Sequence, residues 1–395
     1  MELDPSSVLC CALTEDKSHF GIGTKNGFQI FDCRKGVNSV LNRNLFETGI
    51  KHLAFLATSS IFVFVGDNKQ QNSEYGPNKV VIWDDIQMSP IMEIQLLSKI
   101  YQIRINKNFL FVVTKKAIYV IDFEQAKTKH LFLHNSKSLK NKTIFDICYP
   151  EIENQKIAYP DLNKHIICIK TIEFPEYNFG FSYIGKLITF LKFNKMGTWL
   201  GVISDNILVC IYDLIKRGVK QTFTQTSSVQ CLEFSNDNNL LITICNDGSV
   251  NFFKIHHNPN TNYLRKIKQN IDPFFKDYIM KGKYVCGFNK ENIFIVVSSE
   301  GFITKYKINT ISCECEKKKS YSYSKNASIK KEDYTDSSSD SSTQFDYESN
   351  FSSNNDLEIE LNNINKDENK HESWVINGEG KGDEKKKNDE NNIYN

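Results

Sequence analysis

Lys216 and Arg217 stand next to each other in this chain, between Ile215 and Gly218. A guanidinium group binds phosphate through two parallel hydrogen bonds, and a lysine ammonium adds a second positive charge. The pair therefore has the chemistry of a site for an anionic group. The competing interpretation is a basic surface turn that ends at the glycine.

Enzyme motifs do not accompany this pair. The sequence contains no nucleophile elbow, no phosphate-binding glycine loop and no zinc-ligand spacing. Gly21-Ile22-Gly23 lacks the later glycine and the helix that a dinucleotide site needs. His256 and His257 have no Cys, Asp or Glu at ligand spacing, which favours loop histidines. We expect no catalytic residue, no metal and no cofactor.

The net charge of +2 is divided unevenly along the chain. Residues 317–395 contain 12 Lys and 17 Asp or Glu, a charge of −5, which leaves +7 on the remaining residues. A mildly basic body is compatible with an anionic membrane surface, and equally with an ordinary solvated surface. The bias is too small for a nucleic-acid binder, so we expect no nucleic-acid partner.

The eleven cysteines are scattered, and none of them forms a C-x-x-C pair. Most lie within apolar, strand-like runs, which favours buried free thiols in a reducing compartment. The first residues are acidic where a signal peptide is basic, and no apolar run approaches the ~20 residues of a membrane span. We expect a cytosolic protein that touches membranes only peripherally.

The short apolar runs of this chain form the structural elements that hold any functional site in place. They are 4–7 residues long and rich in β-branched and aromatic residues, which predicts an all-β fold. An apolar or aromatic residue followed by Asp recurs at spacings that fit repeats of ~40–45 residues. These repeats predict a seven-bladed β-propeller, because stacked blades bury the sheet faces and leave short edges. The expected blades are 7–36, 49–97, 98–134, 142–180, 182–223, 227–260 and 283–312.

The composition changes near the end of the last expected blade. Ser, Asn, Lys, Asp and Glu dominate from about residue 317, and such a segment cannot bury enough apolar surface to become ordered. We expect a propeller over residues 1–312 and a low-complexity, disordered tail over 313–395.

The stretch Pro77 to Asp85, with the following Ile91 to Ile94, resembles the second blade of the PROPPINs, also called WIPI proteins. Thr24 to Phe31 and Ala117 to Val120 resemble the first and third blades of the same family. The resemblance extends over about residues 7–312. It implies a seven-bladed, phosphoinositide-binding WD-repeat propeller of autophagy, without enzyme activity.

The family carries an F/L-R-R-G motif between blades five and six, whose two arginines face opposite ways into two lipid-headgroup pockets. By register, this position reads Phe223-Thr224-Gln225-Thr226, so the motif is degenerate and both arginines are absent. The Lys216–Arg217 pair lies about eight residues too early to replace it. The resemblance therefore implies a weakened lipid site, because neutral groups lose the charge-assisted hydrogen bonds. Its residues would be Ser204, Lys216, Arg217, Thr224, Gln225, Thr226, Ser228, Ser249 and Asn251.

A further membrane element of the family is a long loop in blade six. The corresponding segment, about 256–283, alternates basic and large apolar residues, which suits insertion between anionic headgroups. Its candidate residues are Arg265, Lys266, Lys268, Phe274 and Phe275. The alternative is a loop that packs the two phenylalanines onto its own propeller.

In the family, the edges of blades two and three bind the autophagy lipid-transfer protein, and the matching residues here are Asp16, Asn78 and Lys79. The resemblance thus implies a cytoplasmic scaffold recruited to phosphatidylinositol 3-phosphate or 3,5-bisphosphate on autophagosome-precursor, endosomal or other organelle membranes. The alternative hypothesis is a protein adaptor that has lost phosphoinositide binding.

Overall fold

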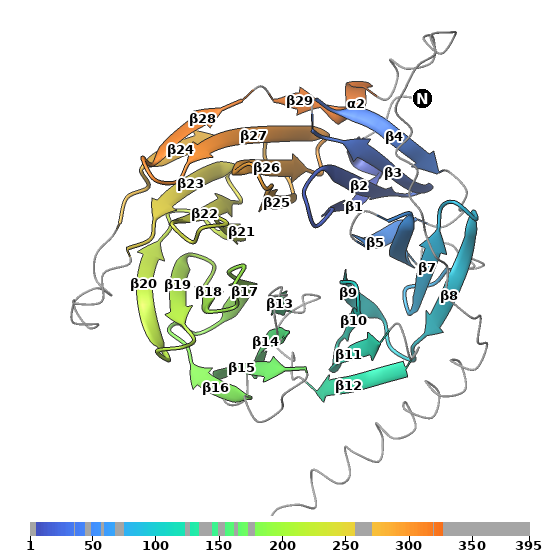
Figure 1. The fold of residues 1–395 in the computed structure, drawn as a ribbon, viewed down its shortest axis with the longest axis horizontal. Helices are drawn as coiled ribbons and strands as arrows, with labels where there is room; N and C mark the ends of the chain where they lie inside the picture. The colour runs from blue at the N-terminus through green and yellow to red at the C-terminus, as the bar shows by residue number, and fades with distance from the viewer. Residues whose placement is uncertain are drawn as a thin grey trace, which may run out of the picture.

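Seven antiparallel β-sheets surround a central axis in the computed structural model, and each sheet is one blade of a propeller (Figure 1). The described residues are 5–34, 36–43, 49–56, 59–67, 75–122, 127–133, 144–148, 155–161, 165–172, 178–256, 271–318 and 320–326. The predicted all-β, seven-bladed fold is confirmed. The tail expected to be disordered lies, from residue 327 on, outside the described residues.

Each of the first four blades consists of four consecutive strands, which follow a 3-10 turn η1 (Pro5–Ser7). Blade one contains β1 (Val8–Leu13), β2 (His19–Thr24), β3 (Gly27–Asp32) and β4 (Asn38–Arg43). Blade two contains β5 (Ile50–Phe55), β6 (Ile61–Gly66), β7 (Lys79–Asp84) and β8 (Ser89–Gln95). Blade three contains β9 (Ile100–Ile105), β10 (Phe109–Thr114), β11 (Ala117–Asp122) and β12 (Lys127–Leu133). Blade four contains β13 (Asp146–Cys148), β14 (Lys156–Asp161), β15 (Ile166–Thr171) and β16 (Phe179–Ser182).

The last three blades complete the ring, and the seventh receives a fifth, short strand. Blade five contains β17 (Ile188–Phe193), β18 (Trp199–Ser204), β19 (Leu208–Asp213) and β20 (Gly218–Thr224). Blade six contains β21 (Val229–Phe234), β22 (Leu240–Cys245), β23 (Ser249–Lys254) and β24 (Phe275–Tyr278). Blade seven contains β25 (Tyr284–Phe288), β26 (Ile293–Ser298), β27 (Phe302–Asn309), β28 (Glu314–Lys317) and β29 (Tyr321–Ser322), before the helical turn α2 (Tyr323–Asn326).

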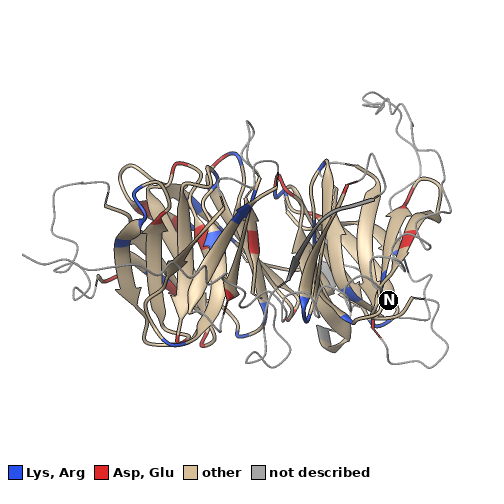
Figure 2. Cartoon of the chain, turned by 90° about the horizontal axis from the view of Figure 1, so that it is seen from below, with Lys and Arg blue, Asp and Glu red and all other residues tan. Residues whose placement is uncertain are grey.

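The first strand of each blade lies nearest the axis and the fourth lies at the rim (Figure 1). Because neighbouring strands are antiparallel, the turns between first and second strands emerge on one face of the ring, here called the 1–2 face. The turns between second and third strands emerge on the opposite face, here called the 2–3 face. Seen edge-on, the strands stand between these two faces, and both faces carry charged residues (Figure 2).

The carboxylates that predicted the repeat lie at the ends of third strands, where they hold the following turn. Asp84 Oδ1 accepts a hydrogen bond from the Ile86 N–H at 2.9 Å, and Asp213 Oδ1 accepts one from the Ile215 N–H at 3.0 Å. Such local hydrogen bonds satisfy backbone N–H groups that form no hydrogen bond to a neighbouring strand. The repeated Asp is therefore a turn-forming residue of the blade.

The core lies between neighbouring blades rather than within one sheet. One cluster joins Val63 and Val80 of blade two to Leu110 and Val112 of blade three. Glycines allow the close approach of blades: a Cβ on Gly21 would lie 2.3 Å from a ring carbon of Phe55. Gly21 therefore serves packing between blades one and two, which explains a glycine in a strand that has no dinucleotide site.

The expected blade limits differ from the structure mainly at the outermost strands. The predicted ranges omit β4, β24 and β28, in which every residue is exposed or half-buried. Ordered structure also continues beyond residue 312, because β28 pairs with Tyr306 to Asn309 and β29 pairs with Phe302 and Ile303. Described secondary structure therefore extends to Asn326, beyond the expected propeller limit at residue 312.

The seam between blades seven and one is closed by the segment β29–α2, here called the latch (residues 321–326). Tyr323 of the latch is fully buried, with its ring centroid 5.2 Å from that of Phe20 and 5.3 Å from that of Phe31 in blade one. Its backbone N–H donates to Gly301 O and its hydroxyl donates to Ser298 O in blade seven. One side chain thus bonds to the last blade and packs against the first.

Candidate lipid-binding rim

The site predicted at the junction of blades five and six begins where β20 ends. Thr224 is the last residue of β20, and it is exposed and pairs with Leu208 of β19. Gln225 follows it, and its side chain is buried toward blade six. Successive side chains of an extended strand point to opposite sides. The two positions that would hold the arginines of the motif therefore face two different environments.

A neutral hydrogen-bonded cluster occupies the blade-six side of this junction. Asn251 Nδ2 donates to Gln225 Oε1 at 3.0 Å, and the Cys245 thiol lies 3.9 Å from the same oxygen. Gln225 Nε2 and the hydroxyl of Thr243 are buried without a hydrogen-bond partner among the described residues. Two buried donors without acceptors cost free energy unless a ligand or water satisfies them. The cluster therefore contains two unsatisfied donors and offers no charge of its own.

One carboxylate and one lysine flank this cluster. Asp247 Oδ1 accepts hydrogen bonds from the backbone and the hydroxyl of Ser249, at 2.9 and 2.7 Å. Burial alone would raise the pKa of Asp247, but these bonds and the nearby Lys276 outweigh it and lower the pKa. Asp247 is consequently an anion near neutral pH. The negative charge of Asp247 counteracts the positive charge of Lys276. In the pairing of β23 with β24, Lys276 lies opposite Asn251.

On the blade-five side of the junction, the backbone covers the side chain of Ser204. Ser204 is fully buried and donates to Ile184 O at 2.7 Å. A Cβ on Gly185 would lie 2.4 Å from the Ser204 hydroxyl, so the backbone lies directly on this side chain. The neighbouring Asp205 accepts the backbone N–H groups of Lys186 and Leu187. Ser204 therefore supports the turn instead of presenting a free hydroxyl.

Lys216 and Arg217 lie at the opposite end of β20 from Thr224. Seven strand residues at ~3.3 Å each separate the two ends by about 20 Å. Both basic residues are exposed, and the Arg217 guanidinium lies 5.2 Å from the ring centroid of Phe179 in blade four. Arg217 has a φ of +52°, as expected in a tight turn before a glycine. The pair thus cannot fill the arginine positions of the motif.

The remaining predicted lipid-site residues vary in exposure. Thr226 is exposed, Ser228 is half-buried, and Ser249 and Asn251 are buried. The structure therefore brings Gln225, Ser249 and Asn251 together within blade six. It leaves Ser204 on the other side of β20 and the Lys216–Arg217 pair at the far end.

The predicted membrane loop is described only at its end. Arg265, Lys266 and Lys268 lie outside the described residues. Phe274 and Phe275 are half-buried, and their ring centroids lie 6.3 and 5.4 Å from that of Phe252. Phe275 is the first residue of β24 and no longer part of the loop. In this conformation, both rings pack onto blade six.

The predicted partner residues divide between the two faces. Asn78 Nδ2 donates to Leu96 O at 2.9 Å, and Lys79 forms an ion pair with Glu93 at 2.8 Å. Both lie at the start of β7, on the 2–3 face of blade two. Asp16 lies in the β1–β2 turn, on the 1–2 face of blade one, where it accepts the Ser18 backbone N–H at 3.0 Å. The structure does not bring Asp16 together with the other two residues.

The sequence reasoning did not select Lys276 as part of the blade-six site. Its spacing gave no signal, because more than twenty residues separate it from Asn251 along the chain. Only the pairing of β23 with β24 places the two residues opposite each other. Knowledge of the outermost strand would have been needed to identify this lysine.

No metal centre or membrane span occurs within the described part of the chain. In these residues, no three His, Cys, Asp or Glu side chains form a group that could hold a metal ion. The same residues contain no helix long and apolar enough to cross a membrane. The cysteines within the described ranges are free thiols.

Known proteins are similar to this chain in sequence or in fold. Autophagy-related protein 18e of Arabidopsis thaliana is 23% identical over 322 residues, covering 76% of this chain and 84% of that protein. The structure of Kluyveromyces lactis Hsv2p covers 80% of this chain and 99% of its own, with a TM-score of 0.63 and 12% identity. A complex of KlAtg21 with the coiled-coil of AgAtg16 gives a TM-score of 0.64 at 16% identity, again covering 80% of this chain and 99% of that chain. No protein-family model matches the chain.

Together, the fold and the rim site define a seven-bladed β-propeller with a polar, largely uncharged cluster at the edge of blade six. The similar proteins include autophagy-related 18 and SVP1-like proteins. The predicted resemblance to the PROPPINs is thereby confirmed.

Proposed function

We propose that this chain is a non-enzymatic PROPPIN-type scaffold of autophagy or related membrane traffic. It is recruited peripherally to membranes that contain phosphatidylinositol 3-phosphate or 3,5-bisphosphate, and it docks protein partners there. The observation that carries the proposal is the end of β20, where Thr224 and Gln225 point to different sides of the rim. This is the arrangement that two headgroup sites on one membrane require.

Weak single sites are compatible with membrane recruitment. When two sites lie on one molecule, binding of the second headgroup is intramolecular and adds avidity without new contacts. The loss of both arginines nevertheless removes charge-assisted hydrogen bonds of about 1.5–3 kcal/mol each. We therefore expect binding that is weaker and less salt-resistant than a site with two arginines would give.

Flotation with phosphatidylcholine vesicles, with and without phosphatidylinositol 3-phosphate, tests the proposal. The full chain should float with the phosphoinositide vesicles and remain in the soluble fraction with phosphatidylcholine alone. Equal recovery from both vesicle types would contradict phosphoinositide recognition. Asn251→Asp is an informative variant, because it places a second carboxylate beside Asp247 and should reduce flotation. Asn42→Asp, on the exposed outer strand of blade one, is the matched control.

A second function, a protein adaptor without lipid recognition, is favoured by the Gln225–Asn251 hydrogen bond and by the Asp247 carboxylate. These groups fill the blade-six side with neutral and negative partners. An adaptor would bind through the 2–3 face of blade two, where Asn78 and Lys79 lie. KlAtg21, a propeller of this fold, forms a complex with the coiled-coil of AgAtg16, so a coiled coil is a suitable partner to test.

Pull-down with an Atg16-type coiled coil as bait separates the two functions. Lys79→Glu should remove capture, because it repels Glu93 and reverses the surface charge. Asp16→Asn lies on the opposite face and should leave capture unchanged. If flotation fails while capture by the unmodified chain persists, the adaptor function replaces the membrane scaffold.

A further inference from the structure

A small apolar pocket lies between blades six and seven, close to the point where the described chain ends. Its volume is about 160 Å³. The lining residues come from Tyr278 at the end of β24 and the two residues after it, from β26 and β27, from Lys317 at the end of β28, and from Ser320. An engineered cavity of ~150 Å³ holds a benzene molecule. This pocket is therefore large enough for one aliphatic or aromatic side chain.

The mouth of this blade six–seven pocket is apolar and basic. Tyr278 and Met280 are each 58% exposed. Lys276, Lys281 and Lys283 are exposed, and none of the three has an ion pair among the described residues. Lys317, which lines the pocket, is already paired with Asp277 at 2.6 Å. The surface thus fits a ligand that alternates apolar and acidic groups.

The chain itself contains such a segment. Residues 332–360 include nine Asp or Glu and no Lys or Arg. Within it, the run Asp356-Leu357-Glu358-Ile359-Glu360-Leu361 alternates strictly between acidic and aliphatic residues. In an extended conformation, period-two alternation places all the aliphatic side chains on one side and all the carboxylates on the other. Such a strand offers its apolar side to a groove and its carboxylates to lysines on flexible stems.

The net charge of the chain changes from positive to negative where this segment begins. Residues 332–395 contain 6 Lys and 17 Asp or Glu, a charge of −11. The preceding residues hold the other 43 basic and 30 acidic residues, a charge of +13. Opposite charges of this size on one chain attract each other at distances up to about the Debye length, ~8–10 Å at physiological salt.

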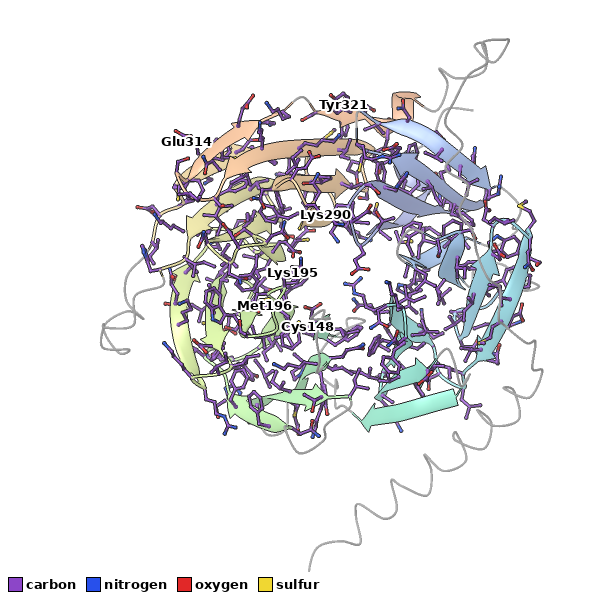
Figure 3. All side chains as sticks on the ribbon, in the orientation of Figure 1. Cys148, Lys195, Met196, Lys290, Glu314 and Tyr321 are labelled. Carbon is purple, nitrogen blue, oxygen red and sulfur yellow. The ribbon has the colours of Figure 1, made fainter. Side chains whose placement is uncertain are left out.

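The position of the chain exit makes the encounter intramolecular. Ser320 lines the pocket, and six residues separate it from Asn326, a path of at most about 20 Å. Figure 3 shows Tyr321 at the rim of blade seven. A random coil of about 30 residues, the number that separates Asn326 from Asp356, would have a root-mean-square span of roughly 30 Å. The segment therefore reaches the pocket at an effective concentration on the order of millimolar.

We propose that residues 332–361 dock in cis on the blade six–seven pocket, with an aliphatic side chain of Leu357, Ile359 or Leu361 inside it and the carboxylates on Lys276, Lys281 and Lys283. The docked segment covers Tyr278 and Met280 and lies beside Ser249, which pairs with Tyr278 in the ladder. Docking is independent of lipid binding, but it places a negative segment next to the blade-six rim.

Zero-length carbodiimide cross-linking of the full chain tests this docking. A mixture of unlabelled and nitrogen-15-labelled protein is cross-linked at low concentration and analysed by mass spectrometry. We expect links from Asp356, Glu358 and Glu360 to Lys276, Lys281 and Lys283, within one isotope class. Lys195 and Lys290 lie on inner turns near the axis and serve as reference lysines (Figure 3). Links as frequent to these reference lysines as to the pocket lysines would overturn the proposal.

Links between isotope classes and the link yields of three variants also test docking in cis. Links between the two isotope classes would mean that the segment binds a second copy, which overturns docking in cis. The triple variant Leu357→Ser, Ile359→Ser, Leu361→Ser keeps every charge and should lower the yield of pocket links at least tenfold. Trp374→Ser, Val375→Ser, Ile376→Ser removes the same number of apolar residues elsewhere in the tail and should leave it unchanged. Met280→Asp, at an exposed position of the pocket mouth, should reduce the yield as the first variant does.

Discussion

His52 lies half-buried in the inner strand of blade two, and its buried Nε2 has no hydrogen-bond partner among the described residues. Burial lowers its pKa from 6.5 to about 4, and the positive charges of Lys51, Lys99 and Arg104 act in the same direction. A histidine with these surroundings is kept neutral in the folded chain. It therefore links stability to pH.

The sign of this linkage follows from where the proton binds. Between pH 6.5 and about 4, the unfolded chain is protonated at His52 while the folded chain is not. The free energy of unfolding should thus fall by about 3 kcal/mol across this window as the pH falls, and His52 contributes no pH dependence above it.

Urea unfolding at a series of pH values measures how the free energy of unfolding depends on pH. His52→Gln should flatten it, and His256→Gln at an exposed ring is the control. An unchanged slope in His52→Gln would show that other groups produce it.

An arginine substituted for Thr224 would have different surroundings from one substituted for Gln225. Thr224 is exposed, so Thr224→Arg adds a cation at no packing cost and should tighten binding to phosphatidylinositol 3-phosphate vesicles about tenfold, equivalent to ~1.4 kcal/mol. Gln225→Arg must break the bond to Asn251 in a buried site, so it should lower the urea midpoint. Asn42→Arg controls for added charge. Equal gains from Thr224→Arg and Asn42→Arg would mean that the rim position has no special role.

At the scale of elements, the inner strands could be predicted and the outermost strands could not. Runs such as Phe109 to Val113 are apolar throughout because both of their faces are covered by neighbouring blades. The outermost strand β4, in contrast, alternates exposed and half-buried residues and contains Asn38 and Asn42, so its sequence is similar to that of a loop. The same reason hid β24, and with it the place of Lys276.

The latch could not be predicted because its sequence is polar and its partners are remote. Lys317 to Asn326 has the composition of a low-complexity tail, and Tyr321 and Tyr323 are its only large side chains apart from lysines. Tyr323 is ordered by Phe20 and Phe31, nearly three hundred residues earlier. Contacts at such separation leave no local sequence pattern. The separation of Lys216 from Thr224 was equally hidden, since it depends on the length of β20.

Tyr323 should dominate the stability of the seam. Tyr323→Ala removes a fully buried ring together with the hydroxyl that donates to Ser298 O, so we expect a loss of about 3–5 kcal/mol. Tyr323→Phe keeps the ring and should cost only about 1 kcal/mol. Urea unfolding measures both values. Similar losses in the two variants would assign the effect to the hydroxyl and contradict the packing role. Hydrogen exchange in β1 and β25 should accelerate in Tyr323→Ala.

At the scale of the whole molecule, each blade is built from consecutive strands, so no exchanged strand among those described joins the first blade to the last. The latch and the contact of β25 with β1 close the ring instead. A chain ending at residue 326 should therefore unfold cooperatively, whereas a chain ending at the predicted limit of 312 lacks β28 and the latch and should not. Circular dichroism during urea titration compares the two. Cooperative unfolding of the shorter chain would show that the ring closes without the latch.

The latch also fixes the order of events during synthesis. Phe20 and Phe31 leave the ribosome early, but the ring that covers them arrives with Tyr323. At ~5–20 residues per second, these two phenylalanines wait about 15–60 seconds for their partner. During that interval blade one presents an apolar edge, a surface that chaperones bind. We therefore expect the beginning of the nascent chain to need protection until Tyr323 has been translated.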